Sequence, residues 1–146
     1  MKKTDLAYTA GIVDGEGCIR IYKSSRKGHK YLDYVLRVDV TNTEIWLCQW
    51  LRFAFGGTVH KHGSLPHCKL CWSWVIQAKA AGEFLQLILP YLNIKRPQAE
   101  LGIKFQNSKI PKRTSILTEE ERAIREVQRI LMQNLKRTKS RTNVLP

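Results

Sequence analysis

Nine residues near the amino terminus, Thr9-Ala10-Gly11-Ile12-Val13-Asp14-Gly15-Glu16-Gly17, form the most informative stretch of this sequence. Apolar and small side chains recur there at helical spacing, which predicts a helix over residues 5–14 that Gly15 and Gly17 end. Gly11 and Gly15 are four positions apart and therefore share one side of this helix. That side would let a second helix approach backbone to backbone, as small residues do in membrane helices.

Two strands and a helix follow this first helix, and then two further strands. Alternation of apolar and polar residues predicts the strands, and the pair Gly56-Gly57 ends the helix between them. The expected positions are residues 19–22 and 36–40 for the first pair, 43–55 for the helix, and 58–62 and 69–76 for the second pair.

Three helical segments are expected in the remainder of the chain. Helical spacing predicts one from Lys79 to about Pro90 and a second over residues 97–107. Thr118 and Glu121 have the spacing of a capping box and predict the start of a third helix, which reaches to about residue 136. Its inner side is expected to be apolar and to consist of Ile124, Val127, Leu131 and Leu135.

Length and composition indicate one compact domain. The chain has 146 residues, 43% of them hydrophobic, and at this size a core is stable without disulfides. We expect a single domain over residues 1–146, with a core at about 5–107, a basic linker and helix at 108–136, and a basic tail at 137–146. Four cysteines without an apolar leader favour a reducing, intracellular location, either bacterial or phage cytoplasm or an organelle interior.

The formal net charge of +13 indicates a polyanionic partner. Residues 1–94 carry a net charge of +5 and residues 95–146 a net charge of +8, so the excess is present in both parts. Release of counterions from phosphates makes nucleic acid the favoured partner of such a surface. No segment combines a basic and an apolar face strongly enough to predict membrane binding.

The stretch at residues 9–17 resembles the LAGLIDADG motif of homing endonucleases, and the likeness continues to about residue 107. It includes the segments Val38–Gly57, Trp72-Ser73-Trp74-Val75-Ile76 and Leu89–Lys95. The resemblance implies an α+β fold with an αββαββα core, an antiparallel sheet forming a DNA-binding saddle, and extra helices at the carboxyl end. Because one motif is present, it also implies a homodimer in which Ala10, Gly11, Asp14 and Gly15 lie at the interface.

The resemblance further implies a site-specific double-strand DNA endonuclease. It would hydrolyse phosphodiesters across the minor groove of a long near-palindromic site and leave 3′ overhangs, with Mg²⁺ or Mn²⁺ as cofactor. Glu16 takes the place of the metal-binding acid and Gly15 that of the backbone ligand. Asp14 is expected to bond the amides at the amino end of the neighbouring motif helix.

Two further residues match catalytic positions of the family. Asn42 matches a residue that positions the attacking water, although an Asn at a strand-to-helix junction is equally well suited to cap the helix. Lys95 matches the active-site lysine, whose charge would offset that of the transition state. The family's remaining basic residue has no clear counterpart in this sequence.

The sheet is expected to read the DNA. If the aliphatic side chains of the strands face the helices, the polar ones project together from the opposite face, which fits the major groove. The residues predicted to contact DNA are Arg20, Tyr22, Ser24, Arg37, Asp39, His60, His62, Lys69, Cys71 and Ser73, with Arg26, Lys27 and Lys30 on phosphates. Cys68 and Cys71 are a weak zinc signal, because no second ligand pair follows.

Two alternatives of other function classes remain open. One is an intron maturase of the same family, for which intron RNA would be the partner. The other is a DNA-binding regulator that keeps the scaffold without cutting.

Overall fold

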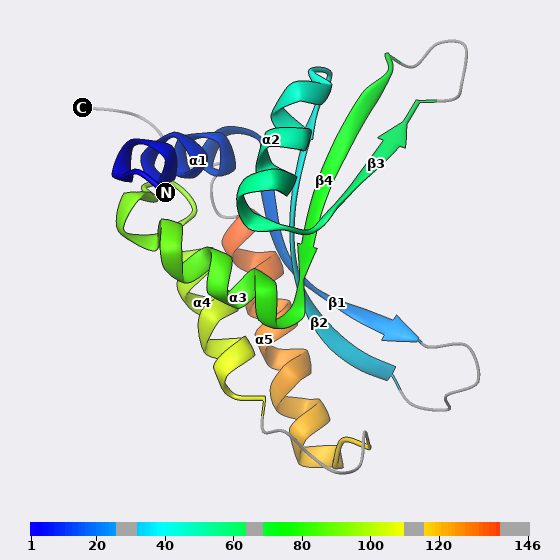
Figure 1. Cartoon of the computed structure of the whole chain (residues 1–146). Coiled ribbons are helices and arrows are strands. Elements are labelled where there is room, and N and C mark those ends of the chain that lie inside the picture. Colours follow the sequence, from blue (N-terminus) through cyan, green and yellow to red (C-terminus); the bar gives the residue numbers. More distant parts are fainter. Residues whose placement is uncertain (26–31, 64–68, 110–115, 138–146) are drawn as a thin grey trace.

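The computed structural model describes residues 1–25, 32–63, 69–109 and 116–137 (Figure 1). The order of elements confirms the predicted αββαββα core with additional helices after it. The elements are α1 (Lys3–Glu16), β1 (Gly17–Ser25), β2 (Leu32–Asn42), α2 (Ile45–Phe55), β3 (Thr58–His62), β4 (Cys71–Gln77), α3 (Ala78–Ile88), the 3-10 turn η1 (Leu89–Tyr91), α4 (Arg96–Asn107) and α5 (Glu119–Arg137).

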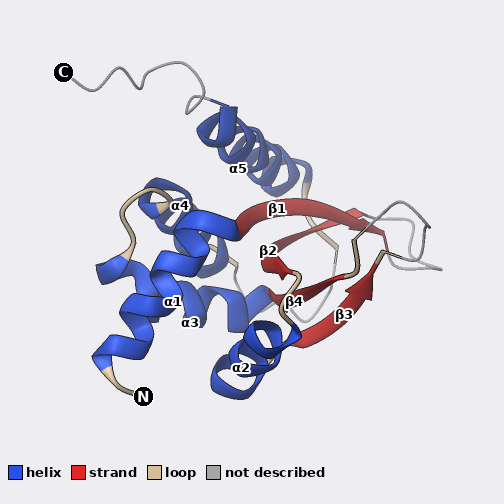
Figure 2. Cartoon of the chain, turned by 90° about the horizontal axis from the view of Figure 1, so that it is seen from above, coloured by secondary structure: helices blue, strands red, loops and turns tan. Residues whose placement is uncertain are grey.

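The four strands form one antiparallel sheet in the order β1-β2-β4-β3. The two hairpins splay apart in Figure 1, which gives the sheet a strong twist. Seen from above in Figure 2, α1, α2, α3 and α4 lie on one side of the sheet. Over the described residues, the other face of the sheet carries no helix.

Alternation along the strands places the core as the sequence predicts. Ile19, Leu36, Val38 and Val40 are completely buried, and their polar neighbours in the chain point to the opposite face. Trp74 joins this core from β4, and its indole Nε1 donates to the carbonyl of Gly56 over 2.7 Å.

The first helix is longer than predicted. It begins at Lys3, where the Asp5 carboxylate accepts a hydrogen bond from the backbone N–H of Lys2 over 3.0 Å. It continues through Gly15 and ends at Glu16. Gly17 is the residue at which the chain turns into β1, and a Cβ there would lie 2.8 Å from the Cα of Val13. The turn is therefore too tight for any side chain at position 17.

The last helix is present where the capping box predicts it, but its orientation differs. Thr118 and Glu121 exchange both capping bonds, over 2.9 and 3.2 Å. The predicted inner face is wrong for three of its four residues: Ile124, Val127 and Leu131 are about half exposed, whereas Leu135 is half-buried and Met132 is the buried residue. The reason is the surface that α5 covers, because the end of the β1–β2 hairpin presents polar groups.

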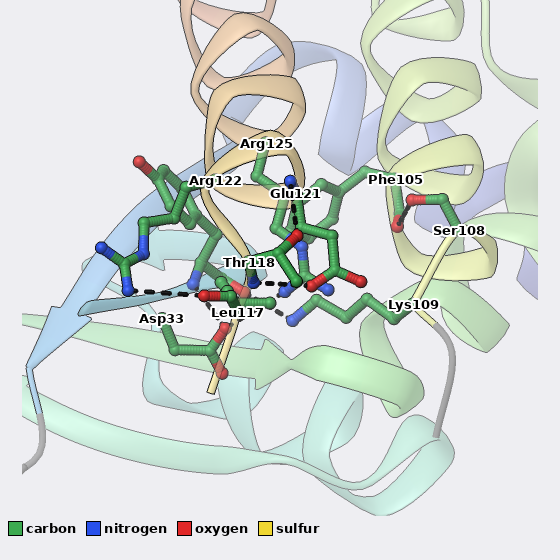
Figure 3. A network of polar contacts seen from close by, with 10 residues as sticks. Asp33, Phe105, Ser108, Lys109, Leu117, Thr118, Glu121, Arg122 and Arg125 are labelled. Atoms are coloured by element: carbon green, nitrogen blue, oxygen red, sulfur yellow. Dashed lines mark hydrogen bonds and ion pairs between the residues drawn. The ribbon is translucent and has the colours of Figure 1, made fainter. Parts of the chain in front are cut away.

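Those polar groups form a network that joins α5 to β2 (Figure 3). Arg125 pairs with Asp33 over 3.2 Å, and Glu126 accepts a hydrogen bond from the hydroxyl of Tyr34 over 2.7 Å. Lys109, beyond the end of α4, donates to the backbone carbonyl of Tyr34 over 2.5 Å. Burial lowers the pKa of Lys109. Charged residues of α5 thus turn inward to meet these partners, and Ile124, Val127 and Leu131 turn outward.

None of the helices in the described ranges is both long enough and apolar enough to span a membrane.

Candidate active site and nucleic-acid interface

The carboxylate of Asp14 is engaged within its own chain. It accepts hydrogen bonds from the backbone N–H groups of Asn93 and Lys95, over 2.9 and 2.8 Å. Lys95 is the residue before α4, so the negative charge lies at the amino end of that helix, where the helix dipole favours it. We expected Asp14 to bond the amides of the neighbouring motif helix of a second chain; within one chain it bonds these amides instead, and a contact with a second chain stays a prediction. Asp14 joins α1 to α4 of the same chain.

Lys95 completes this junction from the other side. Its Nζ donates to the backbone carbonyls of Val13 and Asp14, over 2.7 and 2.8 Å. These carbonyls belong to the last turn of α1. The Val13 carbonyl also accepts a hydrogen bond from the backbone N–H of Gly17, and the ammonium group of Lys95 adds a side-chain donor to both carbonyls, so it caps the helix. Lys95 therefore contacts the carbonyl of Asp14, the residue directly before Gly15. Its role at a scissile phosphate stays a prediction.

Glu16 is the exposed acid of the pair that flanks Gly15. Its Oε2 accepts a hydrogen bond from Nδ2 of Asn42 over 2.5 Å. Asn42 Oδ1 in turn accepts from the backbone N–H of Glu44 over 2.8 Å. Asn42 therefore contacts the candidate metal-binding acid and also accepts from the backbone N–H of Glu44, the residue before α2. Its role in positioning a water stays a prediction.

A shallow hollow on the surface adjoins this acid. Its wall is formed by residues of α1, the end of β2 and α2, namely Tyr8, Gly11, Ile12, Gly15, Glu16, Asn42 and Leu47. Carboxylate, carbonyl and amide oxygens are the ligands that Mg²⁺ accepts, and the ion commonly uses one or two carboxylates together with substrate phosphates. In the described part of the chain no three His, Cys, Asp or Glu side chains cluster as a metal site. One chain therefore offers a partial oxygen site, which fits a metal shared with a second carboxylate or with phosphate.

The open side of α1 includes two glycines, Gly11 and Gly15. A Cβ at Gly11 or Gly15 would meet nothing within 4 Å. Ala10, in contrast, is completely buried in the core of its own chain, so its predicted place at an interface is wrong. The helix turns Ala10 toward the sheet and leaves its glycines exposed. Aromatic rings also lie near this side of α1. Tyr8 and Trp46 are more than half exposed, and both contact the ring of Trp50.

The polar face of the sheet has a connected centre. Arg20 Nη2 lies 2.7 Å from Asp39 Oδ1, and Arg37 Nε lies 3.3 Å from the same oxygen. Beside them the hydroxyl of Tyr22 donates to Gln77 Oε1 over 3.1 Å. Ser24 is half-buried near the end of β1.

The second hairpin contributes fewer accessible groups than expected. Ser73 is 5% exposed and its hydroxyl bonds that of Thr41, so a contact between Ser73 and DNA is not supported. His60, His62 and Lys69 are exposed, and Cys71 is half-buried. Lys69 precedes β4, which begins two residues later than predicted. The predicted phosphate contacts Arg26, Lys27 and Lys30 lie outside the described residues, as does Cys68.

Comparisons with known proteins agree with this geometry. No family model matches the chain. DNA endonuclease I-CvuI of Chlorella vulgaris is 33% identical to it over 116 residues, which span 72% of this chain and 68% of the relative. The chain belongs to the LAGLIDADG homing endonuclease family.

Solved structures of this family share the fold. The crystal structure of I-CvuI in complex with the I-CreI target has a TM-score of 0.78 at 23% identity and covers 96% of this chain and 87% of its own. An archaeal intron-encoded homing endonuclease, I-Vdi141I, complexed with DNA, has a TM-score of 0.74 at 11% identity. The match covers 92% of this chain and 86% of the I-Vdi141I chain. I-TnaI has a TM-score of 0.65 at 20% identity, and the match covers 91% of this chain and 94% of the I-TnaI chain. The I-CvuI crystals contained 2 mM Mg or 2 mM Ca.

Proposed function

We propose that this chain is a site-specific double-strand DNA endonuclease that works as a homodimer and uses a divalent cation, Mg²⁺ or Mn²⁺. The observation that carries the proposal is that the two acidic side chains at the end of α1 differ in exposure and in hydrogen-bond partners. Asp14 is held by two backbone amides, whereas Glu16 is exposed and contacts Asn42 at the edge of a hollow. Family membership adds the reaction class.

A second copy of the chain would complete the oxygen site. The open glycine side of α1 lets two such helices lie close together, and each would bring one Glu16 carboxylate to the shared axis. Charge favours the same side, because none of the seven residues around the hollow is basic in a chain whose net charge is +13. Two copies repel one another least where they meet without lysines and arginines.

The residues of the site divide the work of hydrolysis. Glu16 and the Gly15 carbonyl would hold the cation, which when bound supplies charge for the phosphoryl oxygens and lowers the pKa of a water. Asn42 orients the Glu16 carboxylate through its Nδ2 hydrogen bond. Lys95 and Asp14 fix the last turn of α1, so that Gly15 and Glu16 are presented at one position. Cleavage across the minor groove with 3′ overhangs is part of the proposal.

The open face of the sheet would bind double-stranded DNA. It carries Arg20, Tyr22 and Arg37 from the first hairpin, and His60 and His62 from the second, and a two-stranded ribbon fits the major groove. In a homodimer two such faces lie in sequence along the duplex, which corresponds to a long, near-palindromic site.

The test uses the purified chain, a randomised plasmid library and Mg²⁺, with sequencing of the ends produced. We expect linear DNA with one preferred site from the wild-type chain and none from Glu16→Gln, which should still bind that site. Glu44→Gln is the matched control, because it removes the same charge from an exposed residue two positions after Asn42. Full cutting by Glu16→Gln would overturn the assignment of Glu16.

The remaining outcomes identify the alternatives. Tight, selective binding by the wild-type chain without linear product at any Mg²⁺ or Mn²⁺ concentration would identify a non-cleaving regulator. Restored splicing of a host intron by Glu16→Gln would identify an intron maturase with RNA as its partner.

A further inference from the structure

The centre of the open sheet face holds two arginines on one carboxylate. Arg20 in β1 and Arg37 in β2 both contact Asp39 Oδ1, at 2.7 and 3.3 Å. These two arginines are also direct cross-strand partners in the sheet register. Like charges placed directly opposite one another repel, so without Asp39 the two guanidinium groups would separate. The carboxylate instead draws both toward one point of the face.

Exposure differs among the three side chains. Arg20 is 41% exposed and Arg37 27%, whereas Asp39 is 14% exposed and its Oδ1 atom is buried. The buried Oδ1 atom of Asp39 is therefore not accessible to the amino group of a cytosine. The exposed parts of the arginines are therefore what the face offers to a partner. This departs from the expectation that Asp39 itself contacts a base.

We propose that Asp39 is a positioning residue that holds Arg20 and Arg37 for reading two neighbouring guanines in each half of the DNA site. Arginine pairs with guanine through two parallel hydrogen bonds, which requires a fixed guanidinium plane. The Cα atoms of directly opposed residues in an antiparallel pair lie about 4.5–5.5 Å apart, and the long arginine side chains, drawn toward one carboxylate, can converge on successive bases roughly 3.4 Å apart. The inference rests on the proposed function, because it takes the open face to be the DNA-reading face.

Each residue has a different expected signature. Arg20→Lys keeps the charge but loses the planar fork, so preference for guanine should fall about tenfold at one position of each half-site. Arg37→Lys should do the same at the neighbouring position. Asp39→Asn releases both arginines and should weaken the preference at both positions together, although neither arginine is changed.

The experiment is selection of bound duplexes from a randomised library without divalent metal, which separates recognition from cutting. Glu83→Gln is the matched control for Asp39→Asn, because it removes one negative charge from an exposed residue of α3 and should leave the base preferences unchanged. Thermal melting of each variant shows that it is folded. A residue that only supports the fold would lower the melting temperature and leave the base preferences of the folded protein unchanged.

Three results would overturn the inference. The duplexes selected by the wild-type chain could lack two neighbouring guanines in each half-site. Asp39→Asn could keep the wild-type preference for guanine at both positions, or Glu83→Gln could lose that preference as strongly as Asp39→Asn does. Selective binding with any of these leaves the proposed function standing. Absence of selective binding by the wild-type chain would instead count against the proposed function itself.

Discussion

The helices α1 and α5 both expose one face, but they do so with opposite chemistry. In α1 the side chains of Thr9, Ala10 and Val13 are buried, and the open side includes Gly11 and Gly15. In α5 most aliphatic residues are turned outward, and charged residues contact the β1–β2 hairpin. The difference shows that the apolar side of a helix is buried only where the surface beneath it is apolar too. Under α5 the part of that surface formed by the β1–β2 hairpin is polar and includes Lys23, Asp33 and the Tyr34 hydroxyl.

The largest expected effect tests which of the two open faces meets a second chain. Gly11→Leu should leave the fold intact, because a Cβ there has open space and leucine favours a helix over glycine by about 1 kcal/mol. It should nevertheless dissociate the dimer, raising its dissociation constant by at least about 100-fold, because leucine overpacks a close helix contact. Sedimentation with and without DNA measures this.

The matched change on the other helix is Ile124→Ser, which removes an exposed aliphatic group from α5. It should leave the dimer intact. If Ile124→Ser separated the chains and Gly11→Leu did not, the interface would lie on α5.

A second prediction concerns the two sides of α5 itself. Met132→Ala should lower the free energy of unfolding by about 2–5 kcal/mol, because Met132 is 1% exposed. Its neighbour Leu131 is 47% exposed, so Leu131→Ala should change stability by about 0.5 kcal/mol or less. Urea unfolding of both variants is the measurement. Equal losses would show that α5 is packed on a different side.

The smallest effect is a pH dependence at the contact between α5 and the hairpin. Hydrogen bonds from Arg129, then Tyr34 and Lys23, lower the pKa of Glu126 from about 4.5 to about 2. Because the pKa is lower in the folded chain, this stabilisation is complete above pH 4.5 and is lost as the pH falls toward 2.

The free energy of unfolding of Glu126→Gln should therefore be lower than that of the wild-type chain at pH 6, by roughly 0.5 kcal/mol, because the ion pairs of Glu126 are partly exposed. This difference in stability should be smaller at pH 3. Glu100→Gln, at an exposed position of α4, serves as control. A gap that widens at low pH would contradict the assigned contacts.

Local patterns predicted the elements well, because they depend on neighbouring residues. The strand at residues 58–62 has the predicted bounds, and Gly56 ends α2 as expected. The end of α1 was placed too early, because a glycine such as Gly15 remains helical when the carbonyls of its turn have a partner. The backbone N–H of Gly17 is one such partner, and Lys95 is another, which no local pattern reveals.

The candidate site was predictable in its residues and less so in their contacts. Resemblance to the family pointed to Glu16, Asn42 and Lys95, and two of them meet in a hydrogen bond. The attachment of Asp14 to the amides of residues 93 and 95 could not be inferred, because backbone amides leave no trace in a sequence. The ion pairs that fill the open sheet face were missed for a related reason. Period-two alternation gives the side of a strand but not which charges on it neutralise one another.

The junction between α1 and Lys95 has a consequence for how the chain is made. Lys95 lies 82 and 81 positions after the two carbonyl groups that it caps. A ribosome therefore releases the first helix long before the residue that secures its last turn has been synthesised. Any product that stops short of residue 95 lacks that ammonium group, and the helix end that carries its Glu16 keeps the Gly17 backbone hydrogen bond without the side-chain cap.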